Sequence, residues 1–152
     1  MLNRTIKFRG KRLDDKDLSW CTGYPVPFFK RNDECLYLMN KITASSIYGH
    51  PIVPETLCQF TGMCDRYGRE VWEGDIVRYR TTDDRFKKHP QFVNLVINYD
   101  EESARFQAGD FFWRHLNPSR VEVIGNVFDN PDLLEDRHRY KIVKHEKIYF
   151  TK

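Results

Sequence analysis

The chain has 152 residues and a net charge of +3, a length that favours one compact domain or two small ones. Hydrophobic residues make up 40% of the chain and aromatic residues 14%, which is enough apolar surface for a core and excludes a disordered protein. No apolar run approaches the roughly 20 residues of a membrane-spanning helix, and the first residues lack the apolar stretch of a secretory signal. We therefore expect a folded cytoplasmic protein with no membrane segment.

Short runs of alternating polar and apolar residues, rich in β-branched and aromatic types, predict a mainly β fold. In chain order these runs lie at 5–9, 36–39, 92–99 and 121–128. In the third run Val93, Leu95, Ile97 and Tyr99 are expected on one face of a strand, toward a core.

Turn-forming residues separate the predicted strands. At Tyr67-Gly68 the bulky tyrosine resists a positive φ angle, so a two-residue turn of type I′ is not expected. A longer turn, in which only Gly68 is left-handed, fits this pair better.

Helical signals are few. The segment 131–136 predicts one short helix, with Asn130 as its cap and Pro131 at the first helical position, where the missing N–H is not needed. A second, weaker helix is expected at 43–48. The last segment, 140–150, is apolar enough to predict an ordered strand or pair of strands.

Changes in composition predict three regions. These are a β-rich N-terminal region at 1–56, a small β-barrel domain at 57–135 and a basic extension at 136–152. Residues 1–13 hold five basic residues and no acid, and residues 136–152 hold six basic residues and two acids. We expect most of this charge to be solvated surface, although two basic ends on one face could act together.

The cysteines and histidines do not form a metal-binding pattern. Cys21, Cys35, Cys58 and Cys64 include no closely spaced pair of the kind found in zinc sites, and the five histidines are scattered. We expect reduced thiols, no metal ion and no cofactor.

The segment Trp72-Glu73-Gly74-Asp75-Ile76 has two interpretations. Glu73 and Asp75 could form an acid/base pair, as in a hydrolase. The favoured interpretation is structural, with Trp72 packed at the base of a barrel and Asp75 accepting hydrogen bonds from the turn.

Basic and aromatic residues interleave in a way that is common in single-strand binding proteins. The candidate binding residues are Arg78, Tyr79, Arg80, Phe112, Arg114 and, in the tail, Arg137, Arg139, Lys141 and Lys144. Because strands place alternate residues on opposite faces, half of the aromatic residues are expected in the core instead.

Four segments together resemble the YopX family of phage and prophage proteins. They are IKFRGK at 6–11, PETLCQFTG at 54–62, GREVWEGDIV at 68–77 and VIGNVFDNP at 123–131. The resemblance implies an all-β fold with an SH3-like barrel in the C-terminal part. It implies no biochemical activity. The turn at Tyr67-Gly68, where relatives often have Asn-Gly, and the basic tail depart from the family pattern.

The sequence therefore predicts a non-enzymatic binding or assembly module that forms a homo-oligomer, with a phage or host protein as a further partner. A single-stranded DNA-binding protein is the first alternative, and a hydrolase that uses Glu73 and Asp75 is the second. Salt-dependent binding to DNA would favour the first alternative. A pocket that held both carboxylates would favour the second.

Overall fold

The computed structural model describes residues 5–30, 33–43, 45–80, 92–109, 111–112 and 116–134, with the backbone alone at 29–30, 33–34 and 111–112. The chain divides into two compact units, residues 1–60 and 61–152. This division falls inside strand β5 (Cys58–Cys64).

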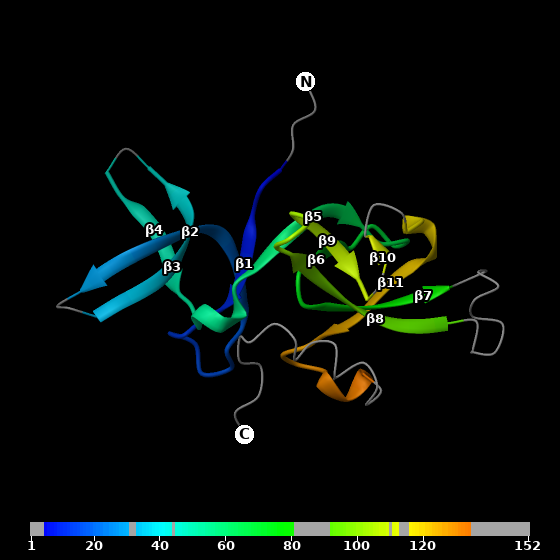
Figure 1. The fold of residues 1–152 in the computed structure, drawn as a ribbon. Coiled ribbons are helices and arrows are strands. Elements are labelled where there is room, and N and C mark those ends of the chain that lie inside the picture. The colour runs from blue at the N-terminus through cyan, green and yellow to red at the C-terminus, as the bar shows by residue number, and fades with distance from the viewer. Residues whose placement is uncertain are drawn as a thin grey trace. The chain divides into compact units, whose positions relative to one another are not determined.

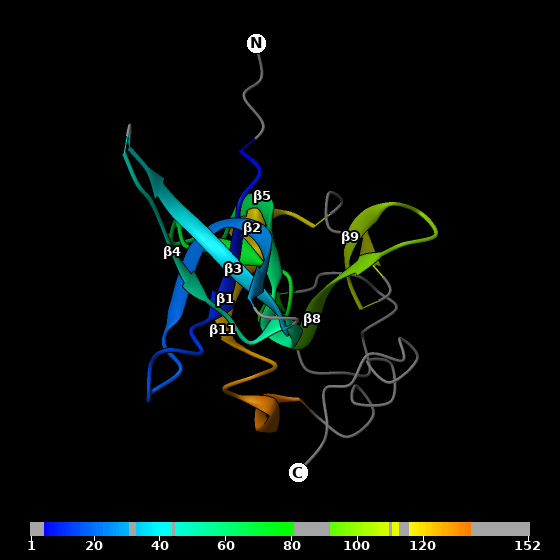
Figure 2. The same ribbon diagram turned by 90° about the vertical axis from the view of Figure 1, so that its left-hand side faces the viewer.

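The first unit is built from long antiparallel strands (Figures 1 and 2). Its elements are β1 (Phe8–Lys11), β2 (Trp20–Lys30), β3 (Asp33–Ile42), β4 (Ile47–Pro51), the 3₁₀ turn η1 (Pro54–Thr56) and the start of β5 (Cys58–Cys64). These strands belong to a six-stranded sheet of order β4-β3-β2-β1-β5-β6, to which the second unit contributes β6 (Glu70–Trp72). Strand β1 pairs with β5 at Phe8–Gln59 and Arg9–Cys58.

Close packing in the first unit depends on a glycine in β1. Leu38 and Ile52 are buried, and Gly10 is buried beside Ile52. A Cβ atom at residue 10 would lie only 2.7 Å from Cδ1 of Ile52. Glycine therefore lets the side chain of Ile52 approach the backbone of β1.

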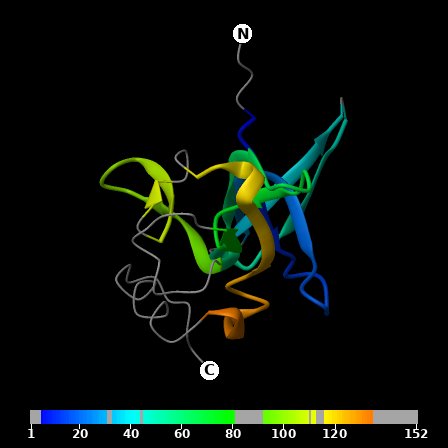
Figure 3. The ribbon, with the colours of Figure 1, turned by 90° about the vertical axis from the view of Figure 1, so that its right-hand side faces the viewer.

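The second unit is a five-stranded antiparallel sheet with the strand order β10-β9-β8-β7-β11. The strands of this sheet are β7 (Asp75–Arg80), β8 (Phe92–Asp100), β9 (Arg105–Ala108), β10 (Phe111–Phe112) and β11 (Val121–Asn126). The same unit holds β6, which belongs to the six-stranded sheet, and the 3₁₀ turns η4 (Pro118–Arg120) and η5 (Pro131–Leu133). Figure 3 shows the chain passing from η4 along β11 to η5.

The core of the second unit confirms the alternation predicted for β8. Leu95 and Ile97 are buried in the core, and Val93 and Tyr99 pack against it. The remaining core residues come from neighbouring segments and are Val71, Val77, Phe106, Ala108, Leu116 and Val121. Tyr99 and Phe106 meet edge to face, with their ring centroids 5.3 Å apart.

Two predictions of tertiary or helical detail are not met. The described strands form two antiparallel sheets whose orders do not close, so the SH3-like barrel is not confirmed. In place of the helix at 131–136, the described residues contain only the 3₁₀ turn Pro131–Leu133, and the side chain of Asn130 does not cap it. The Oδ1 atom of Asn130 instead accepts a hydrogen bond from the backbone N–H of Asn126.

The weak helical prediction at 43–48 is wrong. Ile42 pairs with Ile47 across the β3–β4 hairpin, and the hydroxyl of Thr43 accepts a hydrogen bond from the backbone N–H of Ser46. This local side-chain bond satisfies the turn and competes with a helix. The strand-like segment at 140–150 lies outside the described residues.

Trp72, the last residue of β6, and Asp75, the first residue of β7, flank the β6–β7 turn. Both side chains are buried, and the Asp75 carboxylate accepts a hydrogen bond of 2.9 Å from the backbone N–H of Trp72. Gly74 has a φ angle of +76°, and its N–H donates to the carbonyl of Ile97 in β8. The turn is therefore fastened to the core sheet through its backbone.

Replacement of Trp72 by alanine is expected to lower the free energy of unfolding by about 3–5 kcal/mol, because it removes a large buried ring. Asp75→Ala is expected to cost about 1 kcal/mol, because the N–H of Trp72 loses its acceptor. Tyr67→Ala, which removes an exposed ring from the same unit, is the control and should cost well under 1 kcal/mol. Urea unfolding of the three variants measures the loss in the free energy of unfolding for each. Equal losses for Trp72→Ala and Tyr67→Ala would contradict the prediction.

Candidate functional site

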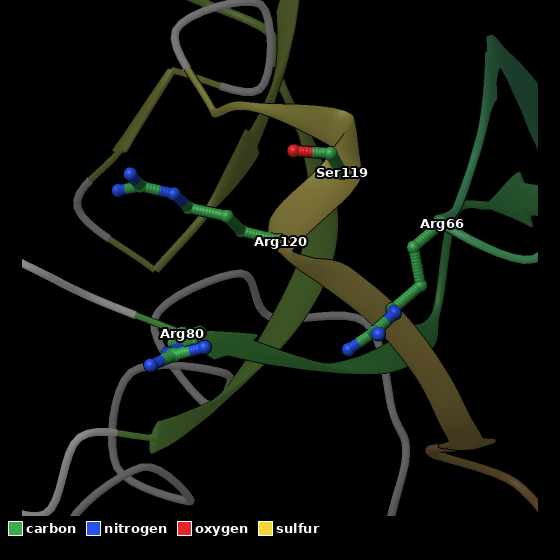
Figure 4. A pocket seen from close by; sticks show the side chains of 4 residues that line it. All are labelled: Arg66, Arg80, Ser119 and Arg120. Atoms are coloured by element: carbon green, nitrogen blue, oxygen red, sulfur yellow. The ribbon is translucent and has the colours of Figure 1, made fainter.

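A hollow in the second unit gathers three arginine side chains. Arg66, Arg80, Ser119 and Arg120 line a space of about 350 Å³ (Figure 4). Arg66 and Arg80 are exposed, and Arg120 is half-buried. We call these four residues the arginine pocket. Positive charge concentrated in a concave site favours an anionic ligand.

The antiparallel pairing of β7 with β11 brings two of these arginines together. Tyr79 in β7 pairs with Val121 in β11, so Arg80 and Arg120 follow at the same end of the two strands. Arg66 arrives from the turn after β5, where its N–H donates a hydrogen bond of 3.0 Å to the carbonyl of Val121. Three segments far apart in the sequence thus meet at one end of the sheet.

The carboxylate of Asp65 holds this arrangement. Its side chain is fully buried, and its Oδ1 atom accepts hydrogen bonds from the backbone N–H groups of Tyr67 (2.8 Å) and Arg69 (3.0 Å). Its Oδ2 atom accepts from the backbone N–H of Val123 in β11 (3.0 Å) and from the Arg69 guanidinium, with Nη2 at 2.7 Å. Asp65 therefore closes the turn and ties it to β11.

These contacts also determine the ionisation of Asp65. Burial by itself would raise the pKa of this carboxyl group, but hydrogen bonds from the N–H groups of Val123, Arg69 and Tyr67 and from the Arg69 side chain together lower the pKa below its ordinary value. Asp65 is thus held as the anion inside the turn.

The turn has the conformation predicted for Tyr67-Gly68. Gly68 has a φ angle of +79°, whereas Tyr67 is not among the residues of positive φ. The N–H of Gly68 donates to the carbonyl of Asp65 at 3.0 Å. The Tyr67 ring stays 60% exposed, with the guanidinium of Arg66 at 4.9 Å and that of Arg69 at 5.1 Å from its centroid.

A second exposed aromatic residue is the cross-strand partner of an arginine of the pocket. Phe92, the first residue of β8, pairs with Arg80 and is 46% exposed. Arg80 therefore has an aromatic residue as its cross-strand partner in β8 and directly follows the residue that pairs with Val121 of β11.

The predicted nucleic-acid residues are divided by the structure. Arg80 lies in the arginine pocket and Arg78 is exposed on the same strand, where it pairs with Glu122 and Asn94. Tyr79 packs against the core instead. The remaining candidates cannot be placed by their side chains, because they lie outside the described residues or are described by backbone alone; they are Phe112, Arg114, Arg137, Arg139, Lys141 and Lys144.

Sequence reasoning missed Arg66, Arg120 and the role of Asp65. The pattern Asp65-Arg66-Tyr67-Gly68 carries a signal for Asp65, since an aspartate three residues before a glycine is typical of a turn that the aspartate side chain closes. No local signal marks Arg120, because its place beside Arg80 depends on strand pairing.

An apolar face covers β2 and β3 in the first unit. Because directly paired residues share a face, Tyr24 with Met39 and Val26 with Tyr37 place four apolar side chains together, and Phe28 continues the row. Tyr24 is 62% exposed and Phe28 is 49% exposed. We call Tyr24, Val26, Phe28, Tyr37 and Met39 the β2–β3 face.

Basic residues in β1 and directly before it contact aromatic rings. The guanidinium of Arg9 lies 4.5 Å and the Nζ atom of Lys11 5.7 Å from the centroid of Trp20, and Nζ of Lys7 lies 4.8 Å from that of Phe60. Part of the positive charge near the start of the chain is thus placed over rings of the first unit.

The carboxylates of the alternative acid/base pair, Glu73 and Asp75, flank Gly74 in the β6–β7 turn. The Asp75 carboxylate is buried against the N–H of Trp72, and neither Asp75 nor Glu73 lines the arginine pocket. Within the described ranges, no three His, Cys, Asp or Glu side chains are grouped so that they could hold a metal ion. In the same ranges, no helix is long and apolar enough to cross a membrane.

Fold and sites together define an all-β protein of two antiparallel sheets with a cationic pocket and an exposed apolar face. The chain belongs to the YopX family, whose sequence pattern, described as YopX protein, matches residues 7–135. The fold is similar to the crystal structure of protein EF1440 from Enterococcus faecalis, with a TM-score of 0.52 and 24% sequence identity over 86% of this chain and 99% of that one. Comparison with curated proteins finds no match.

Asp65→Asn is expected to lower the free energy of unfolding at pH 7 by about 1–3 kcal/mol, because buried N–H donors lose a charged acceptor. Since the pKa of Asp65 is lowered in the folded state, its stabilisation is complete above the ordinary carboxyl pKa of about 4 and is lost as the pH falls through the folded value. The difference in the free energy of unfolding between the native protein and Asp65→Asn, measured by urea titration, should therefore shrink as the pH is lowered from 7 to 2.5.

Glu101→Gln is the matched control, because it removes one exposed carboxylate from a turn of the same unit. It should leave stability within about 0.5 kcal/mol at pH 7. A pH-independent difference between Asp65→Asn and the native protein would show that the ionised carboxylate does not stabilise the turn.

Proposed function

We propose that the chain is a non-enzymatic binding and assembly module that self-associates through the β2–β3 face of its first unit. The observation that supports this function is the row of apolar side chains on paired strands, in which Tyr24, Val26 and Phe28 are exposed and Tyr37 and Met39 are half-buried. Contiguous apolar surface is uncommon on monomeric proteins and marks sites of association. A phage or host protein is a further partner of the same module.

The chemistry of the face suits contact between copies. Aromatic residues and methionine are enriched at the centres of protein interfaces, and the face combines two tyrosines, Phe28 and Met39 without a charged side chain. The rings of Phe28 and Tyr37 pack together, with their centroids 5.6 Å apart, so they form a preorganised surface. Symmetric pairing would let each copy cover the face of the other.

The hydrolase alternative has less support. It needs two carboxylates that reach a shared substrate, whereas Asp75 is buried in the β6–β7 turn. The nucleic-acid alternative is supported by the arginine pocket. We therefore keep binding, without catalysis, as the proposed function of both units.

The native chain is expected to form a dimer or a larger closed oligomer at micromolar concentration, as measured by sedimentation or light scattering. Tyr24→Asp and Val26→Asp should each shift the equilibrium toward the monomer at least tenfold, because they place a carboxylate in the contact.

Leu13→Asp is the matched control, since Leu13 is an exposed apolar residue of the same unit that lies outside the β2–β3 face. It should leave the measured mass unchanged. A monomeric mass for the native chain across the micromolar range would contradict self-association. If Leu13→Asp weakened the oligomer as much as Tyr24→Asp does, the β2–β3 face would not be the site of association.

A further inference from the structure

We propose that the arginine pocket is a phosphate-binding site for a single-stranded nucleic acid, with the exposed rings of Tyr67 and Phe92 as stacking platforms for the adjoining bases. The inference goes beyond self-association and gives the nucleic-acid alternative a defined site. It does not depend on the β2–β3 face.

The pocket has the chemistry of a phosphate site. An arginine guanidinium presents several N–H donors in a planar fork that matches the oxygens of a phosphate group. Arg66, Arg80 and Arg120 supply three such groups around one hollow, and Ser119 adds a hydroxyl. A space of about 350 Å³ is at the lower end of the roughly 300–1,000 Å³ found for small-ligand sites, so it accommodates more than a bare ion.

The pairing of the strands places like charges beside one another. Arg80 is the last residue of β7 and Arg120 is the last residue of η4, directly before β11, so the two lie at the same end of the paired strands. A phosphate bound in the pocket would offer oxygen acceptors to both guanidinium groups. The nearby carboxylate of Asp65 faces the backbone and Arg69, while Arg66 lines the pocket.

The exposed rings favour a nucleic-acid strand over an acidic peptide. Tyr67 lies against Arg66, and Phe92 pairs with Arg80, so each ring adjoins an arginine of the pocket. Bases stack on such aromatic rings with about 1–3 kcal/mol each, whereas glutamate side chains have no ring to stack. Cationic groups combined with exposed aromatic rings are typical of proteins that bind single strands.

The test measures binding of a fluorescein-labelled 12-nucleotide oligothymidylate by anisotropy between 50 and 300 mM NaCl. The native chain should bind. The logarithm of its association constant should fall linearly with the logarithm of the salt concentration, with a slope of about −0.7 for each phosphate neutralised. Arg66→Ala, Arg80→Ala and Arg120→Ala should each weaken binding at least fivefold, and the triple variant should lose at least about 0.7 of that slope.

Arg78→Ala is the matched control, because it removes the same charge from the same strand but outside the pocket. It should change affinity less than twofold. A loss of affinity equal to that of Arg80→Ala would show that binding depends on the general positive charge of the surface and not on the pocket. Tyr67→Leu and Phe92→Leu should weaken binding while keeping the salt slope. Circular dichroism of every variant verifies that it is folded.

Competitors separate the sources of the anion. Thymidine monophosphate and inorganic phosphate should displace the oligonucleotide only at far higher concentrations than unlabelled oligothymidylate. Displacement by the mononucleotide at equal concentration would overturn the assignment to a strand. Equal displacement by polyglutamate of matched charge, or no binding by the native chain at 50 mM NaCl, would overturn the nucleic-acid assignment altogether. Self-association is tested separately, by the mass of Tyr24→Asp in solution, so failure of one proposal does not imply failure of the other.

Discussion

The buried carboxylate of Asp65 is the interaction on which the second unit depends. A charge removed from water is costly unless its hydrogen bonds are complete, and here two backbone N–H groups of its own turn, one of β11 and the Arg69 guanidinium supply them. One side chain therefore closes the β5–β6 turn and holds the edge of the sheet. The same connection determines where Arg66 stands relative to β11.

The two units separate two kinds of surface. The first unit presents uncharged apolar side chains on paired strands, and the second gathers guanidinium groups at one end of its sheet. Apolar area promotes association with little directional demand, whereas arginine requires an acceptor of defined geometry. These two surfaces are the ones to which we assign the proposed self-association and the proposed anionic ligand.

Much of the β architecture could be predicted, and the reasons are local. The period of two in β8 correctly placed Leu95 and Ile97 in the core, and steric resistance at Tyr67 correctly left only Gly68 with a positive φ angle. The helix expected at 131–136 is not confirmed, because the described residues there contain only the 3₁₀ turn Pro131–Leu133. The side chain of Asn130 does not cap this turn, and its Oδ1 atom accepts a hydrogen bond from the N–H of Asn126 instead. Local polar bonds of this kind compete with a cap and leave little trace in the sequence.

The sequence by itself determined the strand faces, the turn glycines and the membership of the YopX family, because these follow from contacts within a few residues or from matched segments. Only the tertiary structure decided which arginines act together. Arg66, Arg80 and Arg120 meet because β11 pairs with β7 on one side and receives the N–H of Arg66 on the other. Pairing between distant segments depends on the packing of the whole sheet, and no local pattern records it.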